Sequence, residues 1–273
     1  MPKLKKEYDV AIAYSQVSSL KYYLIDKITA KKKYAFYHNG AYTFDDHTKQ
    51  LDKKYYSQYD AVCAVSPGAM KLLSDTFGDE VQVKLVPNSI QETEILRQAE
   101  IPCLEIESYG GFKMVTVSRL SPEKNPLLLV DVCAELSKKT EDYRLFVIGD
   151  GELKSAMEAR IHDKNLEKNV QMVGYRENPY CFMKNCDLYI QMSEYEAEPL
   201  TIKEMALFGK PMVLSNIEGF RLYKDALPTI TLVEKNPKEI VDAILNIWNN
   251  KTTTHATQTL NQFAFDAIDE LFN

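Results

Sequence analysis

Short apolar runs alternate along the chain with longer stretches in which apolar residues recur every three or four positions. Runs of the first kind are typical of strands buried on both faces of a parallel sheet. Stretches of the second kind are typical of helices packed on such a sheet. The alternation starts near residue 8 and continues to about residue 249. The pattern therefore predicts an α/β protein built from parallel sheets.

The first part of the chain shows four such strands. They are predicted at Tyr8–Ala13, Tyr34–Tyr37, Ala61–Val65 and Gln82–Val86, with helices at 18–30, 47–58 and 67–76. Doubly wound domains usually have more strands, and no opening strand with a glycine-rich turn precedes these. We therefore expect an N-terminal domain that is incomplete at its start. A break at 88–110, with two adjacent glycines and a predicted helix at 91–99, indicates a connection to a second domain.

The second part predicts six parallel strands with helices between them. The strands are Lys113–Ser118, Arg144–Ile148, Val170–Val173, Leu188–Met192, Met212–Leu214 and Thr229–Val233, and the helices cover about 125–139, 152–164, 199–208 and 237–249. A last helix is predicted at 255–272. Its apolar stripe comprises Leu260, Phe263, Ala264, Ala267, Ile268 and Leu271.

The apolar stripe of the last helix needs a partner surface, because an isolated helix of this length is marginal in water. The second domain already has helices for both faces of its sheet, so we expect the last helix to return to the first domain. The polar run 249–254 would serve as the crossing linker. The expected organisation is a partial N-terminal domain (1–95), a linker (96–110), a C-terminal domain (111–250) and the returning helix (251–273).

Charge is unevenly distributed along the chain. The net charge is −6, but residues 1–58 carry eleven lysines and six acidic residues, a balance of 11 − 6 = +5, so the remainder sums to −6 − 5 = −11. The basic stretch is short and contains no arginine, which argues against a nucleic-acid partner. It fits either a contact with an anionic membrane surface or a solvated lysine-rich face.

The five cysteines, Cys63, Cys103, Cys133, Cys181 and Cys186, show no paired CxxC spacing. Their odd number favours reduced, mostly buried thiols over disulfides or a zinc site. No apolar run approaches the roughly 18 residues of a membrane-spanning helix, and no secretory signal is recognisable at the N-terminus. We therefore expect a cytoplasmic protein, with peripheral contact at the inner face of the membrane as an extension of that interpretation.

The densest chemical signal is the segment from Ser193 to Pro211. Glu196 follows a predicted strand, and Glu204 lies eight positions later inside a helix that Pro199 would open. A helix N-terminus at the carboxyl end of a parallel strand favours an anion such as a diphosphate. A partly buried Glu204 needs hydrogen-bond donors, and the vicinal diol of a ribose supplies two. The alternative is a pair of surface glutamates near a helix start, where acids are common.

A second signal lies on the predicted loop after the first strand of the second domain. Arg119 and Lys124 stand there, before a helix that Asn125 would cap and Pro126 would open. A guanidinium and an ammonium at the carboxyl end of a strand can neutralise a diphosphate leaving group. An exposed basic pair near a turn is the alternative interpretation.

These spaced elements resemble the family-4 retaining glycosyltransferases of the GT-B fold. Glu196 and Glu204 match the two glutamates of the family's E-x7-E motif, and Arg119 with Lys124 matches its upstream basic pair. Val147-Ile-Gly-Asp-Gly-Glu152 resembles the family's glycine turn, which includes Gly149. Val173-Gly-Tyr175 resembles the segment near the nucleotide base. The resemblance implies two facing Rossmann-like domains, the N-terminal one incomplete.

The same resemblance implies roles for individual residues. Glu204 would bind the ribose hydroxyls, Arg119 and Lys124 the diphosphate, and Glu196 the transferred sugar. Ala197 stands where the family usually has glycine, and this departure bears on the exact contact with the sugar. The remaining donor-binding residues are Gly149, Tyr175, Ala197, Glu198, Pro199 and Leu200.

In the first domain, Ala35-Phe-Tyr-His38-Asn resembles the family's strand that ends in a histidine pointing at the donor sugar. His38 is therefore a catalytic candidate, beside Glu196, Arg119 and Lys124. A structural hydrogen bond is the alternative explanation for a lone histidine there. Ser66 is explained as a helix cap before Pro67, and Asn88 as a turn residue.

The implied activity is transfer of a sugar from a nucleotide-diphosphate donor, a UDP-sugar first of all, to a glycan or lipid-linked acceptor in cell-surface polysaccharide synthesis. The resemblance implies no cofactor and no metal, and no D-x-D motif occurs in the sequence. Two alternatives remain open at this point. The chain would be a nucleotide-sugar-binding module without turnover, or a nucleotide-sugar epimerase on the same fold.

Overall fold

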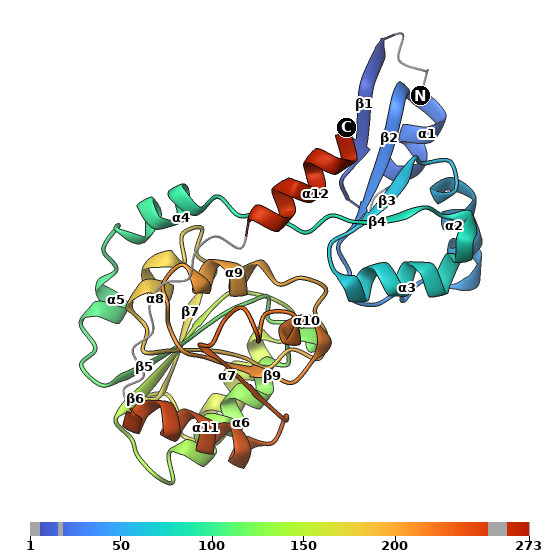
Figure 1. Cartoon of the computed structure of the whole chain (residues 1–273). Coiled ribbons are helices and arrows are strands. Elements are labelled where there is room, and N and C mark those ends of the chain that lie inside the picture. Colours follow the sequence, from blue (N-terminus) through green and yellow to red (C-terminus); the bar gives the residue numbers. More distant parts are fainter. Residues whose placement is uncertain (1–5, 16–18, 251–260, 273) are drawn as a thin grey trace. The chain divides into compact units, whose positions relative to one another are not determined.

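The computed structural model of the chain describes residues 6–15, 19–250 and 261–272 (Figure 1). Two compact units can be separated by their internal contacts. The N-terminal unit comprises residues up to Ser89 together with Glu196–Glu198 and the C-terminal helix. The C-terminal unit comprises Ile90–Tyr195 and residues 199–250. Residues 96–110, the expected linker, therefore fall within the second unit, where they carry the end of helix α4 and all of helix α5.

The N-terminal unit is a four-stranded parallel sheet in the order β1-β2-β3-β4. Its strands are β1 (Glu7–Ala13), β2 (Thr29–Tyr37), β3 (Ala61–Ala64) and β4 (Val83–Leu85), and its helices are α1 (Leu20–Lys27), α2 (Asp46–Tyr56) and α3 (Pro67–Phe77), with a 3₁₀ turn η1 (Gly78–Glu80). The side chain of Ser66 accepts the N–H of Ala69 at 3.2 Å, so the predicted cap of α3 is confirmed.

The predicted helix at 18–30 was wrong at its C-terminal end. Within the described residues the helix ends at Lys27, and β2 begins at Thr29, opposite Glu7 of β1. Lysines at 31–33 are good helix formers, which makes this boundary hard to see in the sequence. Pairing of residues 29–35 with β1 overrides that local preference.

Two lysines of the basic N-terminal stretch, Lys21 and Lys33, bind groups within the N-terminal unit. Lys21 is buried and forms an ion pair of 2.7 Å with Asp52, whose carboxylate also accepts the phenol of Tyr42 at 3.0 Å. Lys33 donates to the carbonyl oxygens of Leu24 and Ile25 at the end of α1. These ammonium groups stabilise the N-terminal unit, so the basic stretch presents fewer free charges than its sequence suggests.

Helix α12 (Gln262–Phe272) packs on the four-stranded sheet (Figure 1). Leu271 is buried against Tyr34, Cys63 and Val86, and its carbonyl oxygen accepts the phenol of Tyr34 at 2.8 Å. Ala264, Ala267 and Ile268 complete the packed face. Phe263, predicted in the stripe, is 60% exposed because it lies beside this face rather than on it. Of the expected crossing linker at 249–254, residues 249 and 250 end helix α11 (Pro237–Asn250). Residues 251–254 and Leu260 lie outside the described residues.

The C-terminal unit contains a sheet of six parallel strands, which confirms the six predicted strands. Their order, which was not predicted, is β10-β9-β8-β5-β6-β7. The strands are β5 (Phe112–Val117), β6 (Tyr143–Ile148), β7 (Val170–Gly174), β8 (Leu188–Gln191), β9 (Met212–Ser215) and β10 (Ile230–Val233). The predicted helices appear as α4 (Glu92–Ala99), α6 (Pro126–Leu136), α7 (Lys154–Asp163), α9 (Leu200–Ala206) and α11 (Pro237–Asn250). Short helices α5 (Leu104–Glu107), α8 (Tyr180–Asn185) and α10 (Glu218–Arg221) were not predicted.

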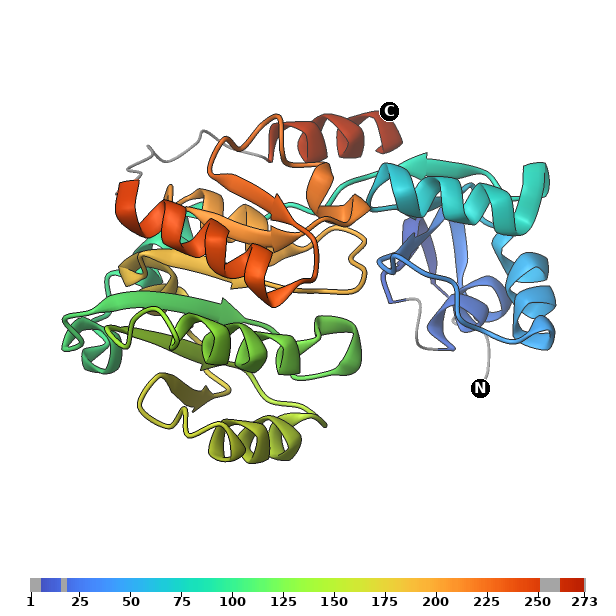
Figure 2. The same ribbon diagram turned by 90° about the horizontal axis from the view of Figure 1, so that it is seen from below.

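The main core of the C-terminal unit lies between its sheet and helices α6, α7 and α11. Figure 2 shows α6 in green and α11 in orange-red lying along the sheet. At the margin of this core, the rings of Phe112 and Trp248 stack with centroids 4.5 Å apart. Apolar strands covered by helices explain why this part of the chain is regular in its sequence pattern.

Leu271→Ala should destabilise the N-terminal unit by about 2–5 kcal/mol, the usual cost of removing a buried leucine side chain. The measurement is native-state hydrogen exchange, with faster exchange expected in β2 and β3 and unchanged exchange in β5 and β6. Phe263→Ala is the matched control, because the Phe263 side chain is largely exposed. Equal exchange in both variants would show that α12 does not stabilise this sheet.

Candidate functional site

The strand order of the six-stranded sheet identifies one edge as the candidate site. The chain builds outward from β5 to β6 and β7, then returns to β8 on the other side of β5. Loops leaving β5 and β8 therefore diverge at the carboxyl ends of the strands. In open α/β sheets, ligands bind in the crevice at this reversal of strand order.

The loop after β5 carries the predicted basic pair. Arg119 is exposed and Lys124 is half-buried in the 3₁₀ turn η2 (Pro122–Lys124), while Leu120 between them is fully buried and anchors the loop. Asn125 precedes Pro126 at the start of α6, but its side chain does not cap the helix, which corrects that prediction. Its amide donates instead to Glu194 of the β8 loop at 2.7 Å.

The glycine turn after β6 packs directly on the backbone of the loop after β5. The N–H of Leu120 donates to the carbonyl of Asp150 at 2.9 Å, and the N–H of Ser118 to that of Ile148 at 3.1 Å. Gly149 has φ +148°, and a Cβ there would lie 1.9 Å from the carbonyl oxygen of Ser118. Only glycine allows this approach, so the turn fixes the backbone on either side of Arg119.

The loop after β8 is supported by a buried polar network. Gln191 accepts the phenol of Tyr189 at 2.7 Å and donates to the hydroxyl of Ser193 at 2.9 Å. Thr201 donates to the same Gln191 oxygen at 3.3 Å, and Ser215 donates to the carbonyl of Ser193 at 2.6 Å. Because these polar groups are buried and bonded to each other, they hold the loop against both β9 and α9.

The two loops are also joined to each other by backbone and side-chain contacts. The N–H of Glu194 donates to the carbonyl of Glu123 at 2.8 Å. The carboxylate of Glu194 receives Asn125 on one oxygen and pairs with Lys235 on the other. The loops that follow β5 and β8 therefore form one connected surface at the carboxyl edge of the sheet.

Glu204 lies on α9, where its neighbours Ile202, Met205 and Ala206 are buried. The phenol of Tyr180 donates to Glu204 Oε1 at 3.2 Å. Burial raises the pKa of Glu204, and the hydrogen bond from Tyr180 opposes that rise. This carboxylate is thus a half-buried acceptor of hydrogen bonds next to the loop from β8, in keeping with the sequence expectation of a partly buried glutamate.

Helix α9 is shorter than predicted. It begins at Leu200 with Pro199 at the N-cap position in an extended conformation, rather than with Pro199 in its first turn. It ends at Ala206, and the chain then turns through Gly209, which has φ +60° and donates its N–H to the carbonyl of Ala206. The left-handed glycine still terminates the segment, as expected.

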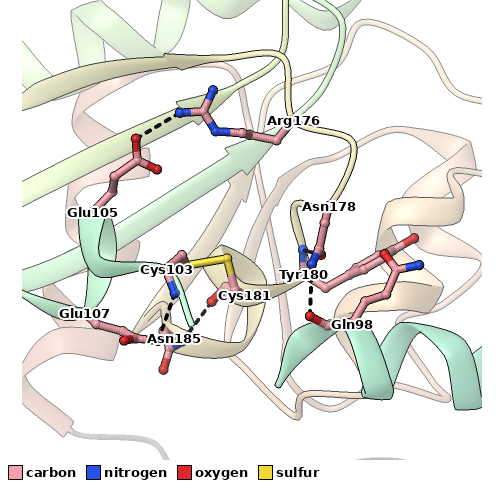
Figure 3. Close-up of a disulfide and its surroundings, with 9 residues drawn as sticks. All are labelled: Gln98, Cys103, Glu105, Glu107, Arg176, Asn178, Tyr180, Cys181 and Asn185. Atoms are coloured by element: carbon pink, nitrogen blue, oxygen red, sulfur yellow. Dashed lines mark hydrogen bonds and ion pairs between the residues drawn. A yellow bond between two sulfur atoms is a disulfide. The ribbon is translucent and has the colours of Figure 1, made fainter. Parts of the chain in front are cut away.

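A disulfide joins Cys103, just before α5, to Cys181 in α8 (Figure 3). The expectation of five reduced thiols was therefore wrong for these two residues, while Cys63, Cys133 and Cys186 are free and buried. The two bonded cysteines are 78 positions apart, and their proximity depends on the packing of α5 against α8. A cysteine count cannot reveal such a pairing.

Four further site candidates, His38, Glu196, Ala197 and Glu198, are grouped with the N-terminal unit. His38 follows β2; its Nε2 lies 3.0 Å from the carbonyl oxygen of Tyr14, and it also bonds the side chain of Asn88. Burial lowers the pKa of His38, and these two hydrogen bonds oppose the shift. The N–H of Asn88 donates to Glu198 at 2.6 Å. The structural hydrogen bond considered for His38 thus exists, and Asn88 does more than form a turn.

The structure brings some predicted residues together and divides others between the units. Arg119, Lys124 and Gly149 lie on adjoining loops of the C-terminal unit, and Glu204 lies on the helix that follows the β8 loop. Tyr175, after β7, is 71% exposed. Glu196, Ala197 and Glu198 are grouped with His38 in the N-terminal unit. The two glutamates of the predicted pair therefore belong to different contact groups.

Comparison with known proteins decides which family this arrangement represents. Residues 107–262 match the sequence model of the family described as Glycosyl transferases group 1. The match covers more than half of the 273 residues and includes the β5, β6 and β8 loops. The chain belongs to this family.

Curated relatives support this assignment. An uncharacterised glycosyltransferase of Methanocaldococcus jannaschii is 27% identical over 169 residues, which are 60% of this chain and 41% of the relative. A poly(ribitol-phosphate) alpha-N-acetylglucosaminyltransferase of Staphylococcus aureus is 29% identical over 136 residues, 49% of this chain and 28% of the relative. An Escherichia coli UDP-Gal:alpha-D-GlcNAc-diphosphoundecaprenol alpha-1,3-galactosyltransferase is 24% identical over 187 residues, 66% of this chain and 48% of the relative. The chain thus spans less than half the length of these relatives.

Solved structures show the same fold. TarM of Staphylococcus aureus superposes with a TM-score of 0.76 at 22% identity, covering 97% of this chain and 54% of TarM. HepE of Anabaena in complex with UDP-glucose superposes with a TM-score of 0.75 at 16% identity, covering 94% of this chain and 82% of HepE. The chain has the GT-B fold of these proteins.

Several residues of the site were missed in the sequence. Gln191 and Ser193 are polar residues at the end of an otherwise apolar strand, and both are buried. Polar residues at that place in the sequence could have indicated a buried hydrogen-bond network. Tyr180 and the Cys103–Cys181 pair carried no comparable signal, because their partners are distant in the sequence.

Gly149→Ala should lower the free energy of unfolding by about 1–3 kcal/mol, because the new methyl group meets the carbonyl oxygen of Ser118 and φ is unfavourable for alanine. Equilibrium unfolding in denaturant gives the measurement. Gly110→Ala is the control, since nothing lies within 4 Å of a Cβ there. Equal stability of the two variants would show that the Gly149 turn does not constrain the loop carrying Arg119.

Proposed function

We propose that the chain is a retaining glycosyltransferase that moves a sugar from a nucleotide-diphosphate donor to a glycan or lipid-linked acceptor in cell-surface polysaccharide synthesis. The observation that carries the proposal is the carboxyl edge of the six-stranded sheet. There, the loop bearing Arg119 and Lys124 is joined to the β8 loop, which leads into the helix bearing Glu204. Membership of the glycosyltransferase family supports the same interpretation.

Each residue of this edge has a role in the proposal. Arg119 and Lys124 bind the diphosphate, and Gly149 keeps the neighbouring backbone close enough for that contact. Glu204 accepts the ribose hydroxyls, Tyr175 lies near the base, and the backbone at Pro199 and Leu200 faces the phosphates. In the N-terminal unit, Glu196, Ala197, Glu198 and His38 serve the transferred sugar.

Catalysis in this proposal is mainly electrostatic. As the bond to the sugar breaks, negative charge grows on the leaving diphosphate, and the fixed cations Arg119 and Lys124 stabilise it. The reaction needs no cofactor and no bound metal. Retention of the anomeric configuration is part of the same proposal and follows from the family resemblance.

The donor we propose is a UDP-sugar. The support is that HepE was solved with UDP-glucose and that the Escherichia coli relative is named for UDP-Gal. The names of two relatives specify a diphosphoundecaprenol-linked sugar and a poly(ribitol-phosphate) as acceptors. A lipid-linked or polymeric acceptor is therefore the class proposed for this chain.

We propose a cytoplasmic location, with lysines of residues 1–58 contacting the inner face of the membrane. Among the described residues, no helix is long and apolar enough to cross a bilayer. Lys31 and Lys53 form exposed ion pairs with Asp9 and Glu80, pairs that contribute little and can be exchanged for anionic lipid. We retain as a proposal the boundaries 1–95, 96–110, 111–250 and 251–273.

The activity test uses a panel of UDP-sugars with a polyprenyl-diphosphate-linked sugar or a polyol-phosphate polymer as acceptor. The expected result is acceptor-dependent glycoside formation with release of UDP, undiminished in excess chelator. Binding of UDP without turnover would identify a binding module. Conversion of the UDP-sugar without acceptor would identify an epimerase. Loss of activity in chelator that metal restores would contradict the metal-independent mechanism.

Arg119→Ala should weaken UDP binding by about 1.5–3 kcal/mol, because a charged hydrogen bond to the diphosphate is lost, and should leave uridine binding nearly unchanged. Isothermal titration of both ligands provides the measurement. Arg160→Ala is the control, because Arg160 lies on α7 and pairs with Asp131. Equal losses for UDP and uridine would refute the diphosphate assignment.

A further inference from the structure

The side chain of Tyr180 forms a hydrogen bond with the carboxylate of Glu204. It stands at the start of α8, and its phenol donates to Glu204 Oε1 at 3.2 Å across 24 positions of sequence. Glu204 itself is half-buried on α9, with buried neighbours on its own helix. A carboxylate in such surroundings adopts the orientation that its hydrogen-bond donors select.

The position of Tyr180 is itself constrained by its surroundings. Its N–H donates to Asn178 Oδ1 at 3.1 Å, and the amide of Asn178 donates to the carbonyl of Gln98 at 2.9 Å (Figure 3). The next residue, Cys181, is bonded to Cys103. The start of α8 is thus attached to the segment from α4 to α5 by a covalent bond and by hydrogen bonds.

Two ion pairs reinforce the same attachment. Lys184 in α8 pairs with Glu100 at 2.7 Å, and Arg176 in the preceding loop pairs with Glu105 at 2.8 Å. Both pairs are partly exposed, so each contributes little alone. Together with the disulfide, they restrict the position of Tyr180 relative to the segment from α4 to α5.

We propose that Tyr180 is a positioning residue that orients the Glu204 carboxylate for the vicinal hydroxyls of a ribose. This inference rests on the proposed function, in which Glu204 accepts those hydroxyls. An ionised carboxylate has about four acceptor sites. One is occupied by the phenol, and the others remain for the two hydroxyl donors of the diol.

The same contact also affects the pKa of Glu204. Burial raises the pKa of Glu204, and the bond from Tyr180 lowers it. Burial and the Glu204 charge raise the pKa of Tyr180 to about 12, with a smaller contribution from Glu94 on α4, so the phenol stays a donor at neutral pH. Without the phenol, the pKa of Glu204 should rise further. The carboxyl group would then take up its proton at a higher pH, and ribose binding should weaken there.

Tyr180→Phe tests the proposal by titration of UDP and 2′,3′-dideoxy-UDP from neutral to mildly acidic pH. The variant should bind UDP about tenfold more weakly, as expected for loss of a hydrogen bond to a charged group. Its affinity for UDP should begin to fall at a higher pH than in the parent. Binding of the dideoxy analogue should change little, because that ligand lacks the hydroxyls.

Tyr143→Phe is the matched control. It removes a buried phenol that donates to the carbonyl of Cys133, far in sequence from Glu204 and on the core side of β6. This control should leave UDP affinity and its pH dependence unchanged. A double-mutant cycle with Glu204→Gln adds a readout that a general structural effect would not move. The two effects on UDP binding should be strongly non-additive.

Unchanged UDP affinity and pH dependence in Tyr180→Phe, or additive effects in the cycle, would overturn the positioning role. Failure of the proposed function has a different signature. In that case the parent chain would bind UDP no more tightly than the dideoxy analogue, and Tyr180→Phe would not alter this ratio.

Discussion

The reversal of strand order between β5 and β8 is the constraint on which the candidate site depends. Because β5 pairs with β6 on one side and β8 on the other, the loops leaving β5 and β8 diverge at the same edge of the sheet. Arg119 and Lys124 stand on one loop, and the other leads through Ser193 into the helix of Glu204. Two cationic side chains and the half-buried carboxylate of Glu204 therefore lie at this edge because of the topology.

Backbone contacts and buried polar groups then fix these loops. Gly149 lets the turn after β6 approach the carbonyl of Ser118. Gln191 donates to the hydroxyl of Ser193 and so holds the loop after β8. The disulfide of Cys181 fixes the start of α8 in the same unit. In the proposed function, this support lets Arg119 bind the diphosphate from a loop whose backbone is held in place.

The sequence predicted the parts of this structure that depend on local pattern. The six apolar strands and the left-handed Gly209 follow from periodicity and from the conformational freedom of glycine. Features that depend on distant contacts could not be predicted. The start of β2 at Thr29 needs β1 as a partner, the disulfide needs α5 beside α8, and the Tyr180–Glu204 bond joins two separate helices. Very short helices such as α8 also lack the length for a recognisable period.

Hydrogen exchange with and without UDP tests most directly whether this edge binds the nucleotide. Bound ligand stabilises the segments that it contacts, so their amides exchange more slowly. UDP bound at this edge should slow exchange in residues 118–125, 149–152 and 193–206, with little change in α2 and α3 of the N-terminal unit. Protection confined to other segments, or no protection at saturating UDP, would contradict a nucleotide site at the carboxyl edge of the six-stranded sheet.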